Sequence, residues 1–160
     1  MSYVKKNLST GEEIIYTAKI HWIIYINGLI LTAIGLGFIF WIQTIDFIDE
    51  SLAPVFTFVG GIIVLIGALN LLAAFIKRIS TELVVTSMRV IAKFGLIRRN
   101  TVELNYSKIE SIEVSQSIFQ RIVNSGTLVV NGTGQAGTPI PNIDEPLVFR
   151  NKVMEIIDKR

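Results

Sequence analysis

The most prominent hydrophobic pattern along the chain is a pair of long runs that contain no charged side chain. The first run covers residues 22–45 and the second covers residues 52–76. An α-helix over the first run would be about 36 Å long, which is enough to cross the hydrocarbon core of a bilayer. A buried helix of a soluble domain is usually shorter and carries a polar face. The pattern therefore predicts an α-helical membrane hairpin of two transmembrane helices.

After Arg78 the pattern changes to short segments rich in Val, Ile and Thr. Residues 81–114 predict four short strands with turn residues between them. In "TVELNY" the residues Val102, Leu104 and Tyr106 fall on one face and the polar residues fall on the other, which is typical of a half-buried antiparallel strand. Gly95 suits a hairpin turn that needs a positive φ.

The next segment, "SIFQRIVNSG" over residues 117–126, has a helical rhythm in which Ile118 and Phe119 pair with Ile122 and Val123. We expect a short helix or turn there, with Asn124 to Gly126 as its end. The segment "TLVVN" that follows predicts another strand.

The C-terminal part of the chain predicts an extended segment followed by a helix. Pro139 and Pro141 favour an extended path at the edge of a sheet. A helix then starts with Asp144 as its cap and Pro146 in its first turn. One apolar stripe runs along this helix: Phe149, Val153, Ile156 and Ile157. The chain therefore divides into an N-terminal segment at 1–21, the hairpin at 22–76, and a mainly-β domain at 77–160.

The charges that flank the two runs predict an orientation in the membrane. The connection between the runs is acidic, whereas basic residues precede the first run and follow the second: Asp46, Asp49 and Glu50 against Lys5, Lys6, Lys19, Lys77 and Arg78. By the positive-inside rule both termini are cytoplasmic. The acidic residues could also be a calcium site, but carboxylates on a tight turn usually form a solvated cap.

Inside the two runs no side chain is ionisable, which argues against a proton relay or an ion-coupled pump. Small residues in both runs allow helix backbones to approach closely: Gly28, Ala33, Gly35, Gly37, Gly60, Gly61 and Gly67. These residues either pack the hairpin against itself or join copies of the chain in a homo-oligomer.

Composition restricts the chemistry of the chain. Hydrophobic residues make up 51% and charged residues only 18%, against about a quarter charged in an average soluble domain. The absence of cysteine excludes disulfides and thiolate metal sites, and the single histidine, His21, leaves little for a zinc site or a catalytic triad. The carboxylates of Glu103, Glu110 and Glu113 have no accompanying nucleophile. We predict no catalytic residue, no metal and no cofactor.

A glycine-rich segment contains Gly132, Gly134 and Gly137 in the spacing G-x-G-x-x-G. A dinucleotide site needs these glycines to open a helix within a βαβ unit, but here Pro139 and Pro141 follow at once. The segment is therefore expected to join two antiparallel strands. It remains a candidate recognition loop, because long loops on rigid sheets often carry binding residues.

The residues from 77 to the end hold twelve Lys and Arg against eight Asp and Glu, a net charge of about +4. This balance suits a domain that lies near an anionic leaflet, and the candidate lipid-contact residues are Lys77, Arg78, Arg98 and Arg99. The alternative is that these side chains are solvated or only set the topology. No basic stripe interleaved with aromatic residues is present, so nucleic acid is not an expected partner.

The order of these parts resembles the bacterial membrane-anchored proteins with a pleckstrin-homology-like (PH-like) domain, the bacterial PH family. The resemblance lies in "GEEIIYTAKIHW", in residues 81–134 and in "PIPNI". It implies two roughly orthogonal antiparallel sheets closed by a C-terminal helix, and a location in the bacterial cytoplasmic membrane. In such a fold "EEIIYTAKI" either adds a strand or lies along the membrane. The basic loop that binds phosphoinositides in eukaryotic relatives is absent, because only "TSM" precedes Arg89.

The resemblance implies a non-catalytic interaction or scaffolding module that binds a protein or peptide, such as another membrane protein, at the cytoplasmic membrane face. One alternative is a protein that binds anionic membrane lipids or self-assembles. Another is an accessory subunit of a transporter or secretion system.

Overall fold

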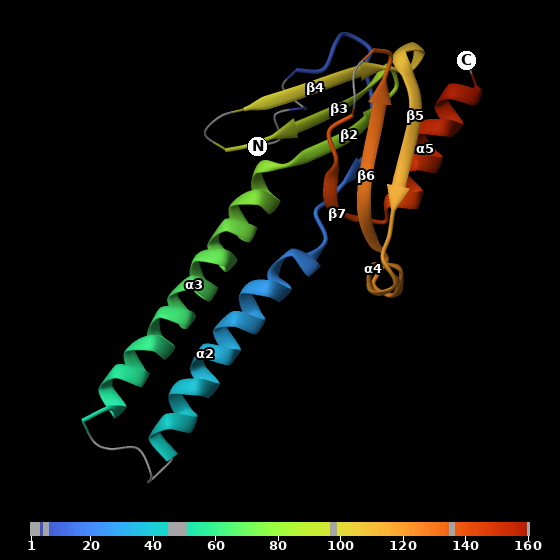
Figure 1. Ribbon diagram of the computed structural model, residues 1–160. Coiled ribbons are helices and arrows are strands. Elements are labelled where there is room, and N and C mark those ends of the chain that lie inside the picture. The colour runs from blue at the N-terminus through green and yellow to red at the C-terminus, as the bar shows by residue number, and fades with distance from the viewer. Residues whose placement is uncertain (1–3, 5–6, 45–50, 97–98, 135–136, 160) are drawn as a thin grey trace. The chain divides into compact units, whose positions relative to one another are not determined.

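The structure is a computed structural model that describes residues 4, 7–44, 51–96, 99–134 and 137–159. The chain forms two compact units (Figure 1). One unit consists of residues 24–76 and is helical. The other combines residues 1–23 with residues 77–160 and contains all the strands found among the described residues. The fold class is as expected: two long apolar helices, two antiparallel sheets and a C-terminal helix.

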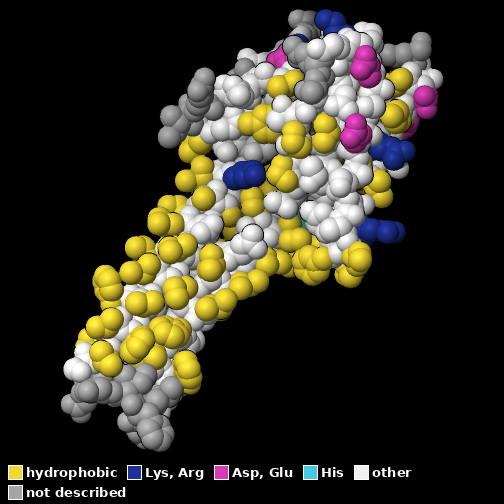
Figure 2. Space-filling view, viewed as in Figure 1, with side chains coloured by type: hydrophobic (Ala, Val, Ile, Leu, Met, Phe, Trp, Pro, Cys, Tyr) yellow, Lys and Arg dark blue, Asp and Glu magenta, His cyan; other side chains and the backbone are white. Residues whose placement is uncertain are grey.

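The apolar runs form two long helices. A short 3₁₀ turn, η1 (Trp22–Tyr25), leads into α2 (Ile26–Thr44), and α3 (Ala53–Ser80) follows the acidic connection, whose residues 45–50 lie outside the described part. Both helices are long and apolar enough to cross a membrane. Their outer faces carry large exposed hydrophobic side chains (Figure 2), with Phe40 72% and Phe58 69% exposed. Such outer faces are compatible with the apolar solvent that a bilayer provides.

Glycines bring α2 and α3 into close contact. A Cβ atom added to Gly35 would lie 2.7 Å from Val64 Cγ2, and one added to Gly67 would lie 2.7 Å from the backbone nitrogen of Thr32. Gly28 and Gly60 are equally crowded by the opposite helix. By contrast, a Cβ at Gly37 or Gly61 would meet no described atom within 4 Å. The small residues of the sequence therefore fall into two sets, and only the first packs the hairpin.

The first sheet is antiparallel, with the strand order β1-β2-β3-β4. Its strands are β1 (Ile14–Ala18), β2 (Glu82–Thr86), β3 (Arg89–Phe94) and β4 (Asn100–Asn105). The segment before the first helix thus adds a strand, which is the first of the two expected alternatives. Gly95, with a φ of +84°, starts the connection from β3 to β4, as the hairpin prediction required.

The second sheet is also antiparallel, with the order β5-β6-β7. Its strands are β5 (Ile109–Ser115), β6 (Ser125–Gly132) and β7 (Ile140–Asp144). The short helix α4 (Ile118–Ile122) connects β5 to β6, and α5 (Pro146–Asp158) ends the chain. The glycine-rich segment joins the antiparallel strands β6 and β7, as predicted.

The core of the β unit lies between the sheets and α5. Phe149 and Val153 of the predicted apolar stripe are fully buried, and Phe149 makes an edge contact with Tyr16 of β1 at a ring-centroid distance of 6.3 Å. On the other face of the first sheet, Val4 packs against Val84 and Ile91. The central strands β2 and β3 are therefore buried on both faces, which explains why their sequences show no alternation.

One local prediction was wrong in detail. The residue that caps α5 is Glu145 and not Asp144; Glu145 has a φ of +48° and makes no side-chain capping bond. The short helix expected within residues 117–126 is present, and its Ile118 and Ile122 are among the most exposed apolar side chains described in the β unit. The prediction of a buried apolar face along "TVELNY" is confirmed in part, because Tyr106 is buried but Val102 is 38% exposed.

Candidate binding site between the two sheets

A small apolar pocket opens between the two sheets, and we call it the inter-sheet pocket. It is lined by Leu83, Val90, Ala92, Phe94, Val102, Leu104, Val130, Thr138 and Ile140. Five strands contribute to this lining. Alternate residues of β3 and β4 point toward the second sheet, and β2, β6 and β7 supply one residue each. Thr138 is the one lining residue with a polar side chain, and it is exposed. With a volume of about 30 Å³, the pocket can accept a small apolar group, but it offers no chemistry for catalysis.

The strand β4 forms one wall of this pocket and is also the edge of its sheet. Among the described residues it pairs only with β3. An edge strand presents unpaired backbone N–H and C=O groups, which can pair with a further strand. The pocket and a backbone surface able to bind a strand are thus next to each other.

The candidate recognition loop lies beside the same strand. Gly132 and Gly134 line a second, polar pocket with Glu103, Leu104, Lys108 and Thr133, which we call the loop pocket. Leu104 lines both pockets, so they adjoin at β4. Gly134 has a φ of +77°, a conformation that favours glycine. The loop therefore lies beside β4, although residues 135 and 136 lie outside the described part, and its role in recognition stays a prediction.

Gly137 has a structural role in this loop. Its backbone N–H donates to the side-chain oxygen of Asn131 at 2.9 Å, and a Cβ there would lie 2.3 Å from the carbonyl oxygen of Val130. The amide nitrogen of Asn131 in turn donates to Ser111 and to Glu113 on β5. These bonds fix the end of the loop to the second sheet, so Gly137 shapes the loop.

Three of the four candidate lipid-contact residues lie in the described part of the chain. Lys77 and Arg78 are in the last turn of α3, and Arg99 is exposed just before β4. Arg98 lies outside the described residues. Because Phe94 pairs with Asn100, Arg99 sits beside the end of β3 that lines the inter-sheet pocket. Lipid contact by these residues stays a prediction.

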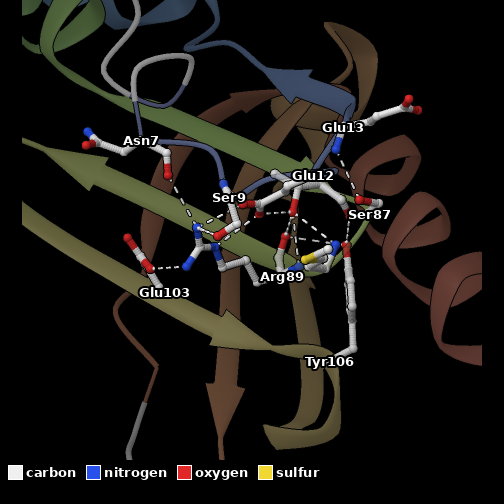
Figure 3. A network of polar contacts seen from close by, with 10 residues as sticks. Asn7, Ser9, Glu12, Glu13, Ser87, Arg89, Glu103 and Tyr106 are labelled. Carbon is white, nitrogen blue, oxygen red and sulfur yellow. Dashed lines mark hydrogen bonds and ion pairs between the residues drawn. The ribbon is translucent and has the colours of Figure 1, made fainter.

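A buried polar network, which sequence analysis missed, fixes the N-terminal segment to the first sheet (Figure 3). The Glu12 side chain is fully buried and accepts from Arg89 at 2.9 Å and from the Thr86 hydroxyl at 2.7 Å. Arg89 also pairs with Glu103 at 2.9 Å, and the Tyr106 hydroxyl donates to the Thr86 carbonyl. Glu12 and Arg89 are far apart in the sequence, so no local pattern could reveal the pair.

This network lowers the pKa of Glu12. Burial raises the pKa of the carboxyl, but hydrogen bonds from the Ser9 backbone, Thr86 and Arg89, with the charge of Arg89, outweigh it and bring the pKa below its ordinary value of 4.5. The side chains that donate to Glu12 are those of Thr86 and Arg89, which belong to the β unit itself. The network therefore has a structural role and holds the N-terminal segment against the first sheet.

The described residues hold no group of three or more His, Asp or Glu side chains that could bind a metal ion. Of the carboxylates considered for acid–base chemistry, Glu103 pairs with Arg89 and Glu113 accepts from Asn131. Both contacts are those of a structural side chain.

Comparison with known proteins places the chain in a family. No curated protein matches it. Among solved structures, one that matches is a DUF1696 family protein with a pleckstrin-homology domain from Shewanella loihica PV-4, at 15% identity and a TM-score of 0.38, covering 48% of this chain and 71% of that one. The sequence matches the bacterial PH domain family over residues 23–157. The chain therefore belongs to the bacterial PH domain family.

Proposed function

We propose that this protein is a non-catalytic binding module, anchored in the bacterial cytoplasmic membrane with both termini in the cytoplasm, that captures an extended segment of another membrane protein. Domains of the PH type commonly serve in binding or scaffolding, which supports the general part of the proposal. The observation that carries the specific part is the inter-sheet pocket beside the free edge of β4.

An extended peptide that added a strand to β4 would satisfy the backbone groups of that edge. Successive side chains of a strand point to opposite faces, so alternate residues of the peptide would face the inter-sheet pocket. Val102, at the rim and 38% exposed, would be covered by an apolar side chain of the peptide. Burial of such a side chain contributes roughly 1.5–3 kcal/mol, and the pocket selects apolar residues at that position.

The loop pocket adds a polar surface for the same peptide. Glu103 and Lys108 bring one negative and one positive side chain to it, and the exposed Gly134 has no described atom within 4 Å of where its Cβ would lie. Charged groups at a rim mainly set specificity and the rate of association. We therefore expect the partner to combine an apolar anchor with flanking polar residues.

The test is photo-crosslinking of the full-length protein in native membranes. A photoreactive amino acid placed at Val102 should give a light-dependent adduct with a second protein, and the linked peptide, identified by mass spectrometry, should contain an apolar residue. The same group placed at Thr17 is the position control, because β1 is the opposite edge of the same sheet and Thr17 is exposed.

A second pair of variants tests the pocket itself. Thr138→Phe places a large side chain at the rim of the inter-sheet pocket and should lower the yield of the Val102 adduct several-fold. Thr133→Phe changes an exposed residue of the same loop that lines only the loop pocket, and it should have less effect. Equal adducts from Thr17 and Val102, or adducts with lipid alone or with the same protein alone, would contradict the proposal.

A further inference from the structure

The helix α4 exposes large apolar side chains on a well-formed local structure. Ser117 caps the helix: its hydroxyl accepts from the Gln120 backbone N–H, and the Gln120 side chain accepts from the Ser117 backbone N–H. The helix therefore begins with a complete capping box. Ile118 is 82% exposed, Phe119 53% and Ile122 77%. Hydrophobic side chains gather at α4 in the space-filling view (Figure 2). Single exposed apolar residues are ordinary, but three on one short helix indicate a contact surface.

Hydrogen bonds place α4 at the end of the β unit where the chain leaves for the first long helix. Directly after α4, the carbonyl of Asn124 accepts from the Glu145 N–H at 3.0 Å. The preceding residue, Asp144, donates its N–H to the Lys19 carbonyl at 2.9 Å, and the His21 N–H donates to Asn142 at 2.7 Å. The next residue, at position 22, begins the first apolar helical segment. Counted along the chain and across these hydrogen bonds, only a few residues therefore lie between α4 and the start of that segment.

Side chains suited to a membrane surface surround this junction. Trp22 is 51% exposed, and Leu147, just after Glu145, is 44% exposed. Lys19, three residues before Trp22, and Arg121, within α4, are also exposed. Tryptophan, large aliphatic residues and basic residues together are typical of the interfacial zone of a bilayer with anionic lipids. The acidic residues here are Asp144, whose Oδ1 lies 3.9 Å from His21 Nε2, and the exposed Glu145.

We propose that α4 inserts Ile118, Phe119 and Ile122 into the interfacial zone of the bilayer in which the two long helices are anchored. The inference rests on the membrane anchoring in the proposed function, but not on the peptide partner. Because the chain enters the membrane within a few residues of this junction, the surface is held at a high effective concentration near α4. A patch too small to bind a membrane alone can then remain inserted, and it would restrict the orientation of the β unit on the membrane.

The absence of cysteine makes the test direct, since one substitution gives a unique labelling site. The full-length protein with Ile122→Cys carries a nitroxide spin label and is reconstituted in vesicles of phosphatidylethanolamine and phosphatidylglycerol. Accessibility to oxygen and to a water-soluble nickel complex is then measured by power saturation. Ile122 is 77% exposed, so the substitution removes little packing.

Two control positions calibrate the measurement. Leu36→Cys, 55% exposed on α2, reports the bilayer itself. Ser107→Cys is exposed before β5, whereas α4 follows the opposite end of that strand, so it reports water. We expect the ratio of oxygen to nickel accessibility at residue 122 to exceed that at residue 107 several-fold and to lie between the two controls.

Two results would overturn the inference. A label at residue 122 that is as accessible to nickel as the label at residue 107 would place α4 in water. A label shielded from both oxygen and nickel would place α4 against protein. The Leu36→Cys label separates this failure from that of the anchoring, because a water-accessible signal at residue 36 would contradict the membrane hairpin itself.

Discussion

At the scale of single residues, the buried Glu12 carboxylate contributes most to fixing the N-terminal segment. Its side chain is fully buried, whereas that of its partner Arg89 is 21% exposed and has a second acidic partner in Glu103. A buried charge is tolerated only when hydrogen bonds satisfy it, and Glu12 has three sources of them in Ser9, Thr86 and Arg89. Removing the charge therefore weakens several contacts together.

We predict that Glu12→Gln lowers the free energy of unfolding by about 2 kcal/mol at neutral pH, as expected for lost hydrogen bonds to a charged group. Because the pKa of Glu12 is lowered in the folded protein, its contribution is present above the ordinary pKa of 4.5 and is lost as the pH falls through the folded value. The curves of the parent and the variant should therefore converge below pH 4.5. Denaturant unfolding of the full-length protein in detergent micelles between pH 3 and pH 7 measures this.

Glu155→Gln is the matched control for this prediction. The pKa of Glu155 is also lowered, by hydrogen bonds and charges from Lys159 and Lys152, but the group is exposed on α5. Solvent screens such a pair, so its removal should leave the unfolding curve nearly unchanged. Equal pH dependence of the parent and Glu12→Gln would show that Glu12 is not the responsible group.

At the scale of elements, the sequence predicted what depends on neighbouring residues and missed what depends on distant ones. The alternation in β4, the turn at Gly95 and the apolar stripe of α5 are local signals, and the elements formed where they indicated. The pairing of β1 with β2 joins residues on either side of the hairpin. The sequence alone therefore could not decide whether the segment at β1 forms a strand or lies along the membrane.

The same distinction applies to the candidate site. The glycine loop was visible as a motif, whereas the inter-sheet pocket is built from alternate residues of five strands whose register only the fold sets. The exposure of α4 was also hidden, because a helical rhythm shows that one face is apolar but not what covers that face. The sequence therefore offered a candidate loop, which stays a prediction, but gave no indication of the pocket.

Packing of α2 against α3 gives a prediction for a matched pair of glycines. Gly35→Ala should lower the stability of the hairpin by roughly 1–3 kcal/mol, because the added Cβ would lie 2.7 Å from Val64 Cγ2 and 2.9 Å from the Val64 backbone nitrogen. Gly37→Ala, two residues along the same helix, meets no described atom within 4 Å and should be neutral or slightly stabilising, since alanine favours helix.

Thermal unfolding of both full-length variants in the same micelles, followed by circular dichroism, compares them directly. A loss of stability in Gly37→Ala similar to that in Gly35→Ala would contradict the assignment of the two glycine sets. It would then indicate that Gly37 lies in a contact with another copy of the chain.

At the scale of the whole molecule, one sheet contains strands from both sides of the helical hairpin. β1 precedes the first long helix and β2 follows the second, yet Ala18 pairs with Leu83 and Thr17 with Val84. A bilayer cannot pass between two hydrogen-bonded strands, so if the hairpin spans a membrane, we expect both of its flanks on the same side. The register of one strand pair thus supports an even number of crossings, independently of the charge pattern.

The charges then decide which side this is. Lys77 and Arg78 end α3, and the connection at residues 46–50 contains acidic residues and no basic residue, so the β unit should be cytoplasmic and the connection external. We expect Ser51→Cys to react with a membrane-impermeant maleimide in intact spheroplasts, and Ser107→Cys to react only after the membrane is permeabilised. Both positions are exposed, so a difference in labelling reports sidedness. Labelling of Ser107→Cys in intact spheroplasts would place the β unit outside, where a cytoplasmic partner could not reach the inter-sheet pocket.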